Sequence, residues 1–225
     1  RLRHILKYCA VARIDHFRGL SAFWEIPAEC ETAKDGRWLP ALGGEMLEAF
    51  RREECGGGEL PLVAEDLGII TDDVRELMAR FGLPGMKVLM FAFGGRVAEN
   101  PYAPHNVAPR SVIYTGTHDN DTAAGWWSGS ATAQERENFA LYTGREVDAG
   151  NAAEIMTRMA LSSTAELAVV PAQDLLGLGS ECRMNRPSVP KGNWGWRLTE
   201  DEFARLRDKA PSLRALNDIY GRLGQ

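Results

Sequence analysis

Short apolar segments alternate with helical patterns along this chain of 225 residues, and the alternation constrains its fold more than any other feature. Five segments are short, rich in Val, Ile, Leu or Phe, and free of polar alternation: residues 11–14, 61–64, 86–93, 112–114 and 167–170. We expect each of them to form a strand that is buried on both faces. The intervening and following patterns predict helices over residues 43–54, 71–82, 131–142, 151–163 and 199–210. Strands that alternate with helices are typical of an α/β fold with a parallel sheet.

The helix predicted over residues 71–82 has the clearest boundary signals. Thr71 is followed by two aspartates, a combination that suits an N-cap and the first turn of a helix. Gly82 and Pro84 suit the end of a helix, because proline cannot continue it. We therefore expect this helix to begin after Thr71 and to end near Gly82.

Polar or acidic residues follow four of the predicted strands, at the points where these strands would end. They belong to the motifs DHFRG at 15–19, EDLG at 65–68, THDNDT at 117–122 and QD at 173–174. In a (β/α)8 TIM barrel the catalytic groups come from the C-terminal ends of several different strands. The recurrence therefore favours a barrel over a doubly wound sheet, which has one switch point.

Five strands are too few to close such a barrel, which needs eight strands and about 250 residues. An unclosed barrel would also leave strand edges exposed. We therefore expect residues 1–225 to form a single catalytic-barrel portion, with strands 4 to 8 and the helices that follow them. The first strands would come from an N-terminal half of the same polypeptide, so we interpret the chain as the C-terminal part of a longer enzyme.

Composition narrows the range of partners and compartments. The net charge is −5 and no block of like charge is present, which argues against nucleic acid or an anionic membrane surface as a partner. No apolar run of about 18 residues could span a bilayer, and the first residues are too polar for a secretory signal, so we expect a cytoplasmic protein. The four cysteines lack the spacing of a zinc site or a disulfide framework.

Asp15, Glu65 and Asp119 each stand at the end of a different predicted strand. Carboxylates that converge beside Arg13 and His118 suit a reaction that develops positive charge, such as glycosidic cleavage. A retaining mechanism uses one carboxylate as nucleophile and one carboxylic acid as proton donor, about 5–5.5 Å apart. Arg13, two residues before Asp15 on the same strand face, would keep that nucleophile ionised. Burial near other carboxylates would keep Glu65 protonated, as an acid catalyst requires.

Seven motifs, in order, resemble those of one known family. They are VARIDHFRG, VAEDLG, GMKVLMFAF, APHN, YTGTHDNDT, QDLLGLG and GNWGWR, and they span nearly the whole chain. Together they resemble the amylomaltase or disproportionating-enzyme family, the 4-α-glucanotransferases of maltodextrin, glycogen and starch metabolism. The resemblance implies a (β/α)8 barrel whose earlier strands are missing here, with α-1,4-glucans as both donor and acceptor.

The resemblance also implies a role for each acid in a retaining glucanotransferase. Asp15 would be the nucleophile that forms a covalent glucosyl-enzyme, Glu65 the acid/base, and Asp119 the stabiliser of the transition state. The glucan would then be transferred to another glucan or to glucose. Beside Asp119, we interpret Asn120 and Asp121 as turn and cap residues.

Four further residues are expected to contact the sugar by the same resemblance. Arg13 and His118 would bind it at the cleavage site, where His118 and Asp119 would hold adjacent hydroxyls. Phe91 and Asn193 lie in matching motifs and would line the sugar groove.

Other functions remain open from the residues alone. The His and Asp residues of RIDH and THDND could hold a metal ion, because both types are common ligands. The chain has only four histidines, however, and a protonated acid is sufficient to cleave an acetal, so we expect neither a metal nor another cofactor. An α-glucan hydrolase would use the same carboxylates and differ only in what attacks the intermediate. A chain that lacks half a barrel could also be an inactive fragment or a non-catalytic interaction module.

Overall fold

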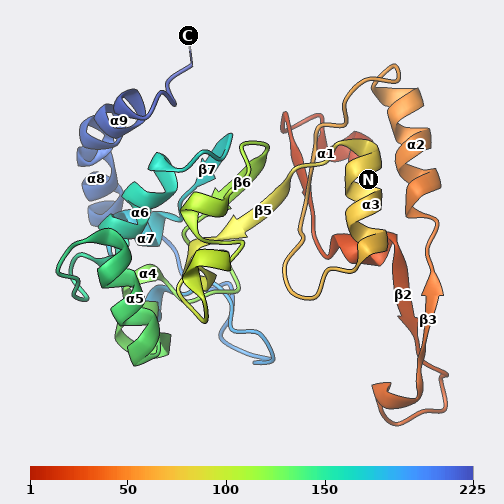
Figure 1. Ribbon diagram of the computed structural model, residues 1–225, viewed down its shortest axis with the longest axis horizontal. Helices are drawn as coiled ribbons and strands as arrows, with labels where there is room; N and C mark the ends of the chain where they lie inside the picture. The colour runs from red at the N-terminus through yellow and green to blue at the C-terminus, as the bar shows by residue number, and fades with distance from the viewer. Residues whose placement is uncertain (225) are drawn as a thin grey trace. The chain divides into compact units, whose positions relative to one another are not determined.

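The computed structural model describes residues 1–224, which divide after Met86 into two compact units (Figure 1). The elements up to that point are α1 (Leu2–Ile5), β1 (Ala12–Ile14), β2 (Ala22–Glu25), β3 (Arg37–Pro40), α2 (Gly43–Glu54), β4 (Leu62–Ala64) and α3 (Asp72–Phe81). They are followed by β5 (Gly85–Val88), β6 (Ser111–Tyr114), α4 (Ala123–Gly125), α5 (Ala133–Thr143), α6 (Ala152–Ser162), β7 (Leu167–Val169), α7 (Ala172–Leu176), α8 (Glu200–Asp208) and α9 (Ala210–Ile219). The α/β class is confirmed. Within residues 1–224, no helix has the length and apolar character needed to cross a membrane.

The first unit is built on a parallel pair of strands, as the alternation predicts. β1 pairs with β4 so that Ala12 lies opposite Leu62 and Ile14 opposite Ala64. All three residues of β4 are buried, in agreement with a strand covered on both faces. Side chains from the strands, from α2 and α3, and from Phe17 form one apolar core, whose fully buried members include Phe17, Leu47, Ala64 and Val74.

Helix α3 begins and ends where the sequence predicts, but the side chain at its N-cap position bonds a carboxylate rather than the helix backbone. Gly82 adopts the left-handed conformation with φ of 58° and closes the helix, which glycine does at little steric cost. Thr71 occupies the N-cap position without a capping side-chain hydrogen bond. Its hydroxyl instead bonds the carboxylate of Asp73, which Ser21 also contacts. These two hydroxyls hold the pKa of Asp73 below its ordinary value.

An antiparallel hairpin, β2 with β3, is present in the first unit and was not predicted. Trp24 lies opposite Trp38, and their rings meet edge to face with centroids 5.4 Å apart. The neighbouring pair joins Glu25 to Arg37 by a 2.7 Å ion pair. In Figure 1 the hairpin extends away from helices α2 and α3. Its strands mix exposed aromatic and charged residues, so they lack the apolar runs by which the other strands were identified.

The second unit contains a three-stranded sheet in the order β5-β6-β7. β6 and β7 run parallel, with Ile113 opposite Ala168. Two expectations were wrong here. The apolar run 86–93 is strand only as far as Val88, because the chain then turns into a 3-10 helix over Leu89–Phe91. β7 is not buried on both faces, since its first and last residues are 49% and 37% exposed.

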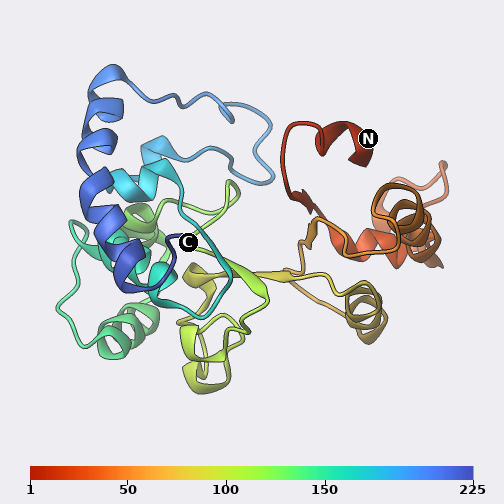
Figure 2. The ribbon, with the colours of Figure 1, turned by 90° about the horizontal axis from the view of Figure 1, so that it is seen from above.

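Among the helices of the second unit, α6 packs directly against the sheet, and further helices pack on α6 and on its neighbour α7. α6 contacts β7 on one side and α9 on another, and α7 contacts α8 (Figure 2). The helix predicted over residues 199–210 ends at Asp208, and Pro211 lies in the first turn of the helix that follows. Both α5 and α8 begin with a capping box, Thr132 with Glu135 and Thr199 with Glu202, so local sequence sets their start.

Three aromatic side chains pack around Phe139 of α5 in the second unit. Phe139 is fully buried, and its ring centroid lies 4.7 Å from that of Phe93. The rings of Trp126 and Trp127, at 5.7 and 5.9 Å, pack on it from a π-helical turn. Leu141, two residues further along the same helix, is 80% exposed.

We expect Phe139→Ala to lower the free energy of unfolding by about 3–5 kcal/mol, because it removes a buried ring and leaves a cavity. Leu141→Ala, on the exposed face of the same helix, should change it by less than about 0.5 kcal/mol. Urea unfolding followed by circular dichroism measures both. Equal effects of the two substitutions would contradict the packing described.

Candidate active site

Asp15 leaves β1 directly beside an arginine from the same strand. The guanidinium of Arg13 donates to the Asp15 carboxylate at 2.9 Å, and its Nε contacts the sulfur of buried Met86 at 3.3 Å. The Arg13 side chain is 27% exposed and that of Asp15 is 73% exposed. One carboxylate oxygen is therefore fixed by Arg13, while most of the group faces open space.

Glu65 leaves β4 at the same sheet edge as Asp15, because Ile14 and Ala64 are paired in the parallel register. The Glu65 carboxylate accepts two backbone N–H groups, from His16 and from Leu67, both at 2.8 Å. The backbone reinforces the connection, since the Glu65 N–H donates to the Ile14 carbonyl at 2.9 Å. Each carboxylate oxygen accepts one of these bonds and retains a second lone pair for another partner.

His16 connects these two acids through its backbone rather than through its ring. It has φ of 48° and ψ of 54°, a left-handed conformation that is uncommon for residues other than glycine. This turn directs the His16 N–H to Glu65 immediately after Asp15. Strained backbone held by its surroundings is a recurrent feature of functional sites.

The loop after β6 carries His118 and Asp119 and is shaped by its neighbours. The side-chain oxygen of Asn120 accepts both the N–H and the hydroxyl of Thr117 at 2.8 Å. Asp121 accepts the Ser180 hydroxyl at 2.8 Å and the N–H of Thr122. Asn120 therefore has the turn role that the sequence predicts. Asp121 bonds the N–H of the next residue and Ser180, whereas the N-cap of α4 is Thr122.

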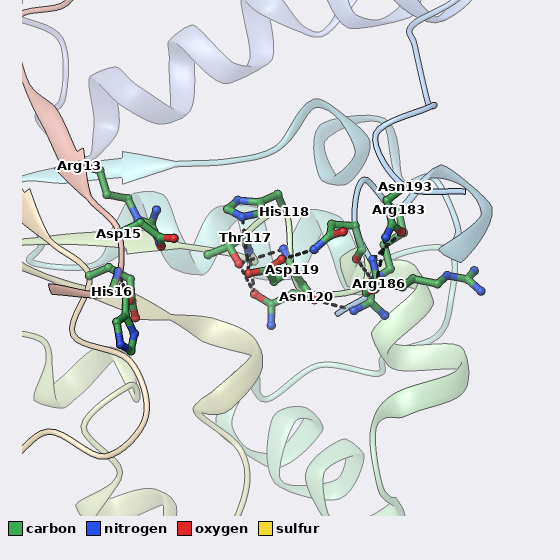
Figure 3. A network of polar contacts seen from close by, with 12 residues as sticks. Arg13, Asp15, His16, Thr117, His118, Asp119, Asn120, Arg183, Arg186 and Asn193 are labelled. Carbon is green, nitrogen blue, oxygen red and sulfur yellow. Dashed lines mark hydrogen bonds and ion pairs between the residues drawn. The ribbon is translucent and has the colours of Figure 1, made fainter. Parts of the chain in front are cut away.

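Residues of the segment that follows α7 form hydrogen bonds with Asp119 (Figure 3). The Asn185 amide donates to the Asp119 carboxylate and the Arg183 guanidinium to the Asp119 carbonyl, both at 2.5 Å. The Asn185 N–H donates to the His118 carbonyl at 3.1 Å. The His118 ring lies 5.2 Å from that of Trp194 and its Nε2 lies 3.5 Å from Asp119. The sequence did not predict Arg183 and Asn185 as partners of Asp119. Their position in the RMN stretch, upstream of GNWGWR, is the one signal that could have suggested them.

The two other predicted sugar-binding residues differ in how free their side chains are. Phe91 is 41% exposed and its ring meets Tyr102 edge to face at 5.5 Å, so one face can contact a ligand. The Asn193 amide is engaged within its own loop: its oxygen accepts the Arg186 N–H at 2.9 Å and its nitrogen donates to the Val189 carbonyl at 2.8 Å. In this structure Asn193 braces the loop that carries Trp194.

A small cavity of about 130 Å³ lies beside the histidine, lined by residues that include His118, Asn120, Gln173 and Arg183. Asp174 also lines it and is 2% exposed. Burial raises the pKa of the Asp174 carboxyl, and the nearby charge of Asp121 adds to the rise, although two hydrogen bonds oppose it. Among residues 1–224, no group of three or more His, Cys, Asp or Glu side chains is arranged to hold a metal ion.

The described geometry gives two acid-bearing sites, one in each unit. Asp15 and Glu65 share a sheet edge in the first unit, while Asp119 is fixed by hydrogen bonds in the second. An exposed carboxylate beside an arginine, next to a second carboxylate, can supply a nucleophile and a proton donor. The convergence of Asp119 on the same rim stays a prediction.

The fold and these sites define an α/β protein with acidic residues at the ends of its strands. The sequence profile described as 4-alpha-glucanotransferase matches residues 1–202. The 4-alpha-glucanotransferase of Thermus thermophilus is 48% identical over 229 residues, covering 96% of this chain and 44% of that protein. The Synechocystis 4-alpha-glucanotransferase is 43% identical, covering 99% and 43%. The chain therefore belongs to the 4-alpha-glucanotransferase family, which confirms the resemblance seen in its motifs.

A solved structure agrees in fold over nearly the whole chain. Amylomaltase from Streptococcus agalactiae in complex with acarbose superposes with a TM-score of 0.90 at 31% identity, covering 99% of this chain and 44% of that one. Amylomaltase from Corynebacterium glutamicum, 18% identical with a TM-score of 0.74, shares the fold. The chain spans less than half the length of each of these relatives.

We expect His16→Val to destabilise the chain by about 1–2 kcal/mol, because a β-branched residue fits the left-handed conformation poorly. His16→Asn should keep the wild-type thermal midpoint, since asparagine adopts that conformation readily and both variants retain the N–H that Glu65 accepts. Thermal unfolding of the two variants measures the difference. Identical midpoints would show that the turn at residue 16 is not held as described.

Proposed function

We propose that the polypeptide carrying this chain is a retaining 4-α-glucanotransferase that acts on α-1,4-glucans. The observation that carries the proposal is the β1–β4 register, which brings Asp15 and Glu65 to one sheet edge in a chain of this family. The acarbose held by the Streptococcus agalactiae neighbour supports a glucan-like ligand for this chain as well. Maltooligosaccharides, glycogen or starch would then be donor and acceptor.

The proposed architecture is the C-terminal part of a (β/α)8 barrel. β1, β4, β5, β6 and β7 would be its strands 4 to 8, and an N-terminal half of the same polypeptide would complete it. Support comes from the neighbour's TM-score of 0.90 and from the chain's coverage of only 44% of that protein. In a closed barrel the strand ends that carry Asp15, Glu65 and Asp119 would share one rim.

In the proposed mechanism, the Asp15 carboxylate attacks the anomeric carbon of the donor. Glu65 gives its proton to the glycosidic oxygen as that bond breaks, and a covalent glucosyl-enzyme results. Glu65, now ionised, accepts the proton of an acceptor hydroxyl, whose oxygen displaces Asp15 from the anomeric carbon and restores both groups. Arg13 holds Asp15 in place for the attack, at 2.9 Å.

Asp119 and the residues around it would act on the charged transition state. A fixed carboxylate stabilises the positive charge that develops at the sugar ring, and it does so without reorganisation if its position is set beforehand. Asn185 and Arg183 supply that fixation. His118, beside Asp119, would hold sugar hydroxyls, and Phe91 would offer an apolar ring face in the groove. Asn193 would contribute by shaping the loop.

We expect Asp15→Asn in the complete polypeptide to lower the transfer rate from maltotriose by at least about a thousandfold, because the amide cannot form the covalent intermediate. Glu76→Gln, an exposed carboxylate on α3, is the matched control and should retain the full rate. Chromatography of the products gives the rates. Glucose with a ladder of longer maltodextrins indicates transfer, whereas glucose and maltose alone would indicate a hydrolase and contradict the proposal.

We expect the transfer activity to be unchanged after treatment with a chelator such as EDTA. A protonated carboxyl can activate the glycosidic oxygen directly, so the proposed step needs no Lewis acid. Activity before and after chelation, and after addition of divalent ions, measures this. Loss of activity that a metal ion restores would revive the interpretation of RIDH and THDND as metal ligands.

A further inference from the structure

A buried carboxylate outside the predicted catalytic set connects two parts of the second unit. Asp174 of α7 is 2% exposed, and its two oxygens have different partners. Oδ2 accepts the Thr115 hydroxyl at 2.5 Å, and Oδ1 accepts the backbone N–H of Ala123 at 2.7 Å. Both partners are fully buried, so neither bond is exchanged readily with water.

The two partners of Asp174 stand at opposite ends of one loop. Thr115 directly follows β6, and Ala123 is the first residue of α4. Residues 116–122 between them include His118 and Asp119. A single side chain therefore bonds both ends of the segment that presents the predicted transition-state stabiliser.

Other contacts tie the same loop to its surroundings without joining its two ends. Asp121 reaches Ser180, and Thr122 caps α4 by accepting the Gly125 N–H at 3.0 Å. A β-carbon on Gly125 would overlap the Ser180 hydroxyl and the Asp121 carboxylate, so this corner is closely packed. The ends of the loop thus have little freedom as long as Asp174 bonds both of them.

The geometry points to Asp174 as a positioning residue that sets the placement of His118 and Asp119 through the two ends of their loop. The inference rests on the proposed function, in which Asp119 stabilises the transition state. Asp174 acts without contact with the sugar. Small displacements of catalytic groups can cost large factors in rate, so the loss of this connection should appear in kcat more than in KM.

A carboxylate suits the observed hydrogen bonds at this position better than an amide does. Both partners are donors, and an asparagine offers only one acceptor oxygen together with an NH2 group. If that oxygen faces the Ala123 N–H, the NH2 group faces the Thr115 hydroxyl. The hydroxyl must then accept a hydrogen bond instead of donating one. Asp174→Asn therefore weakens the connection while it keeps the shape of the side chain.

The test uses the complete polypeptide with substitutions on both sides of the bond. Thr115→Val removes the hydroxyl, and Thr115→Ser restores it. Thr157→Val is the matched control, because Thr157 is a buried threonine of α6 whose hydroxyl has no hydrogen-bond partner within the described residues. With maltotriose as substrate, we expect Asp174→Asn and Thr115→Val to lower kcat by about tenfold or more with KM within about twofold. Thr115→Ser and Thr157→Val should stay near wild type.

Hydrogen exchange of the backbone amides gives a second readout that does not depend on activity. Amides in residues 116–122 should exchange at least about tenfold faster in Asp174→Asn and Thr115→Val, while those in α6 keep their wild-type rates. Unchanged exchange in the loop would overturn the inference, as would faster exchange with unchanged kcat. If the wild-type protein shows no transfer, the proposed function fails, and the exchange rates alone decide whether Asp174 holds the loop.

Discussion

The parallel pairing of β1 with β4 is the constraint on which the candidate site of the first unit depends. Ile14 lies opposite Ala64, so the residues that follow them leave the sheet at the same edge. A shift of one residue in this register would turn one of the two acids to the other face of the sheet. The backbone bond from Glu65 to Ile14, and the bond from His16 to the Glu65 side chain, lock that register.

The second unit fixes its acid by a different means. Asp119 lies well beyond the end of β6, so strand pairing alone does not set its position. Side chains from the later part of the chain hold it instead, since Asn185 bonds its carboxylate and Asp174 bonds both ends of its loop. The buried Asp174 tolerates removal from water because two donors face it. Both units thus present acidic groups on a backbone that hydrogen bonds hold in place.

Local sequence predicted elements well where their signals are local. The helix at 43–54 has the predicted bounds. Gly82 ends α3 as predicted, because the left-handed φ that closes the helix is favoured by the glycine itself. The run 86–93 was misleading, since apolar residues suit a 3-10 turn as well as a strand, and periodicity does not separate the two. The β2–β3 hairpin was missed because its strands are stabilised by cross-strand pairs such as Trp24 with Trp38, which appear only when both strands are seen together.

The sequence by itself determined the family and the α/β alternation, and it singled out the three candidate acids, because all of these depend on residue types at fixed places along the chain. It also predicted the turn role of Asn120, whose partner Thr117 is a near neighbour in the chain. Only the tertiary structure decided which side chains hold those acids. The hydrogen bond between Asn185 and Asp119 joins residues that are 66 positions apart in the sequence, and the bond between Asp174 and Thr115 joins residues that are 59 positions apart. Contacts at such separations follow from the packing of strands and helices, and no local pattern records them.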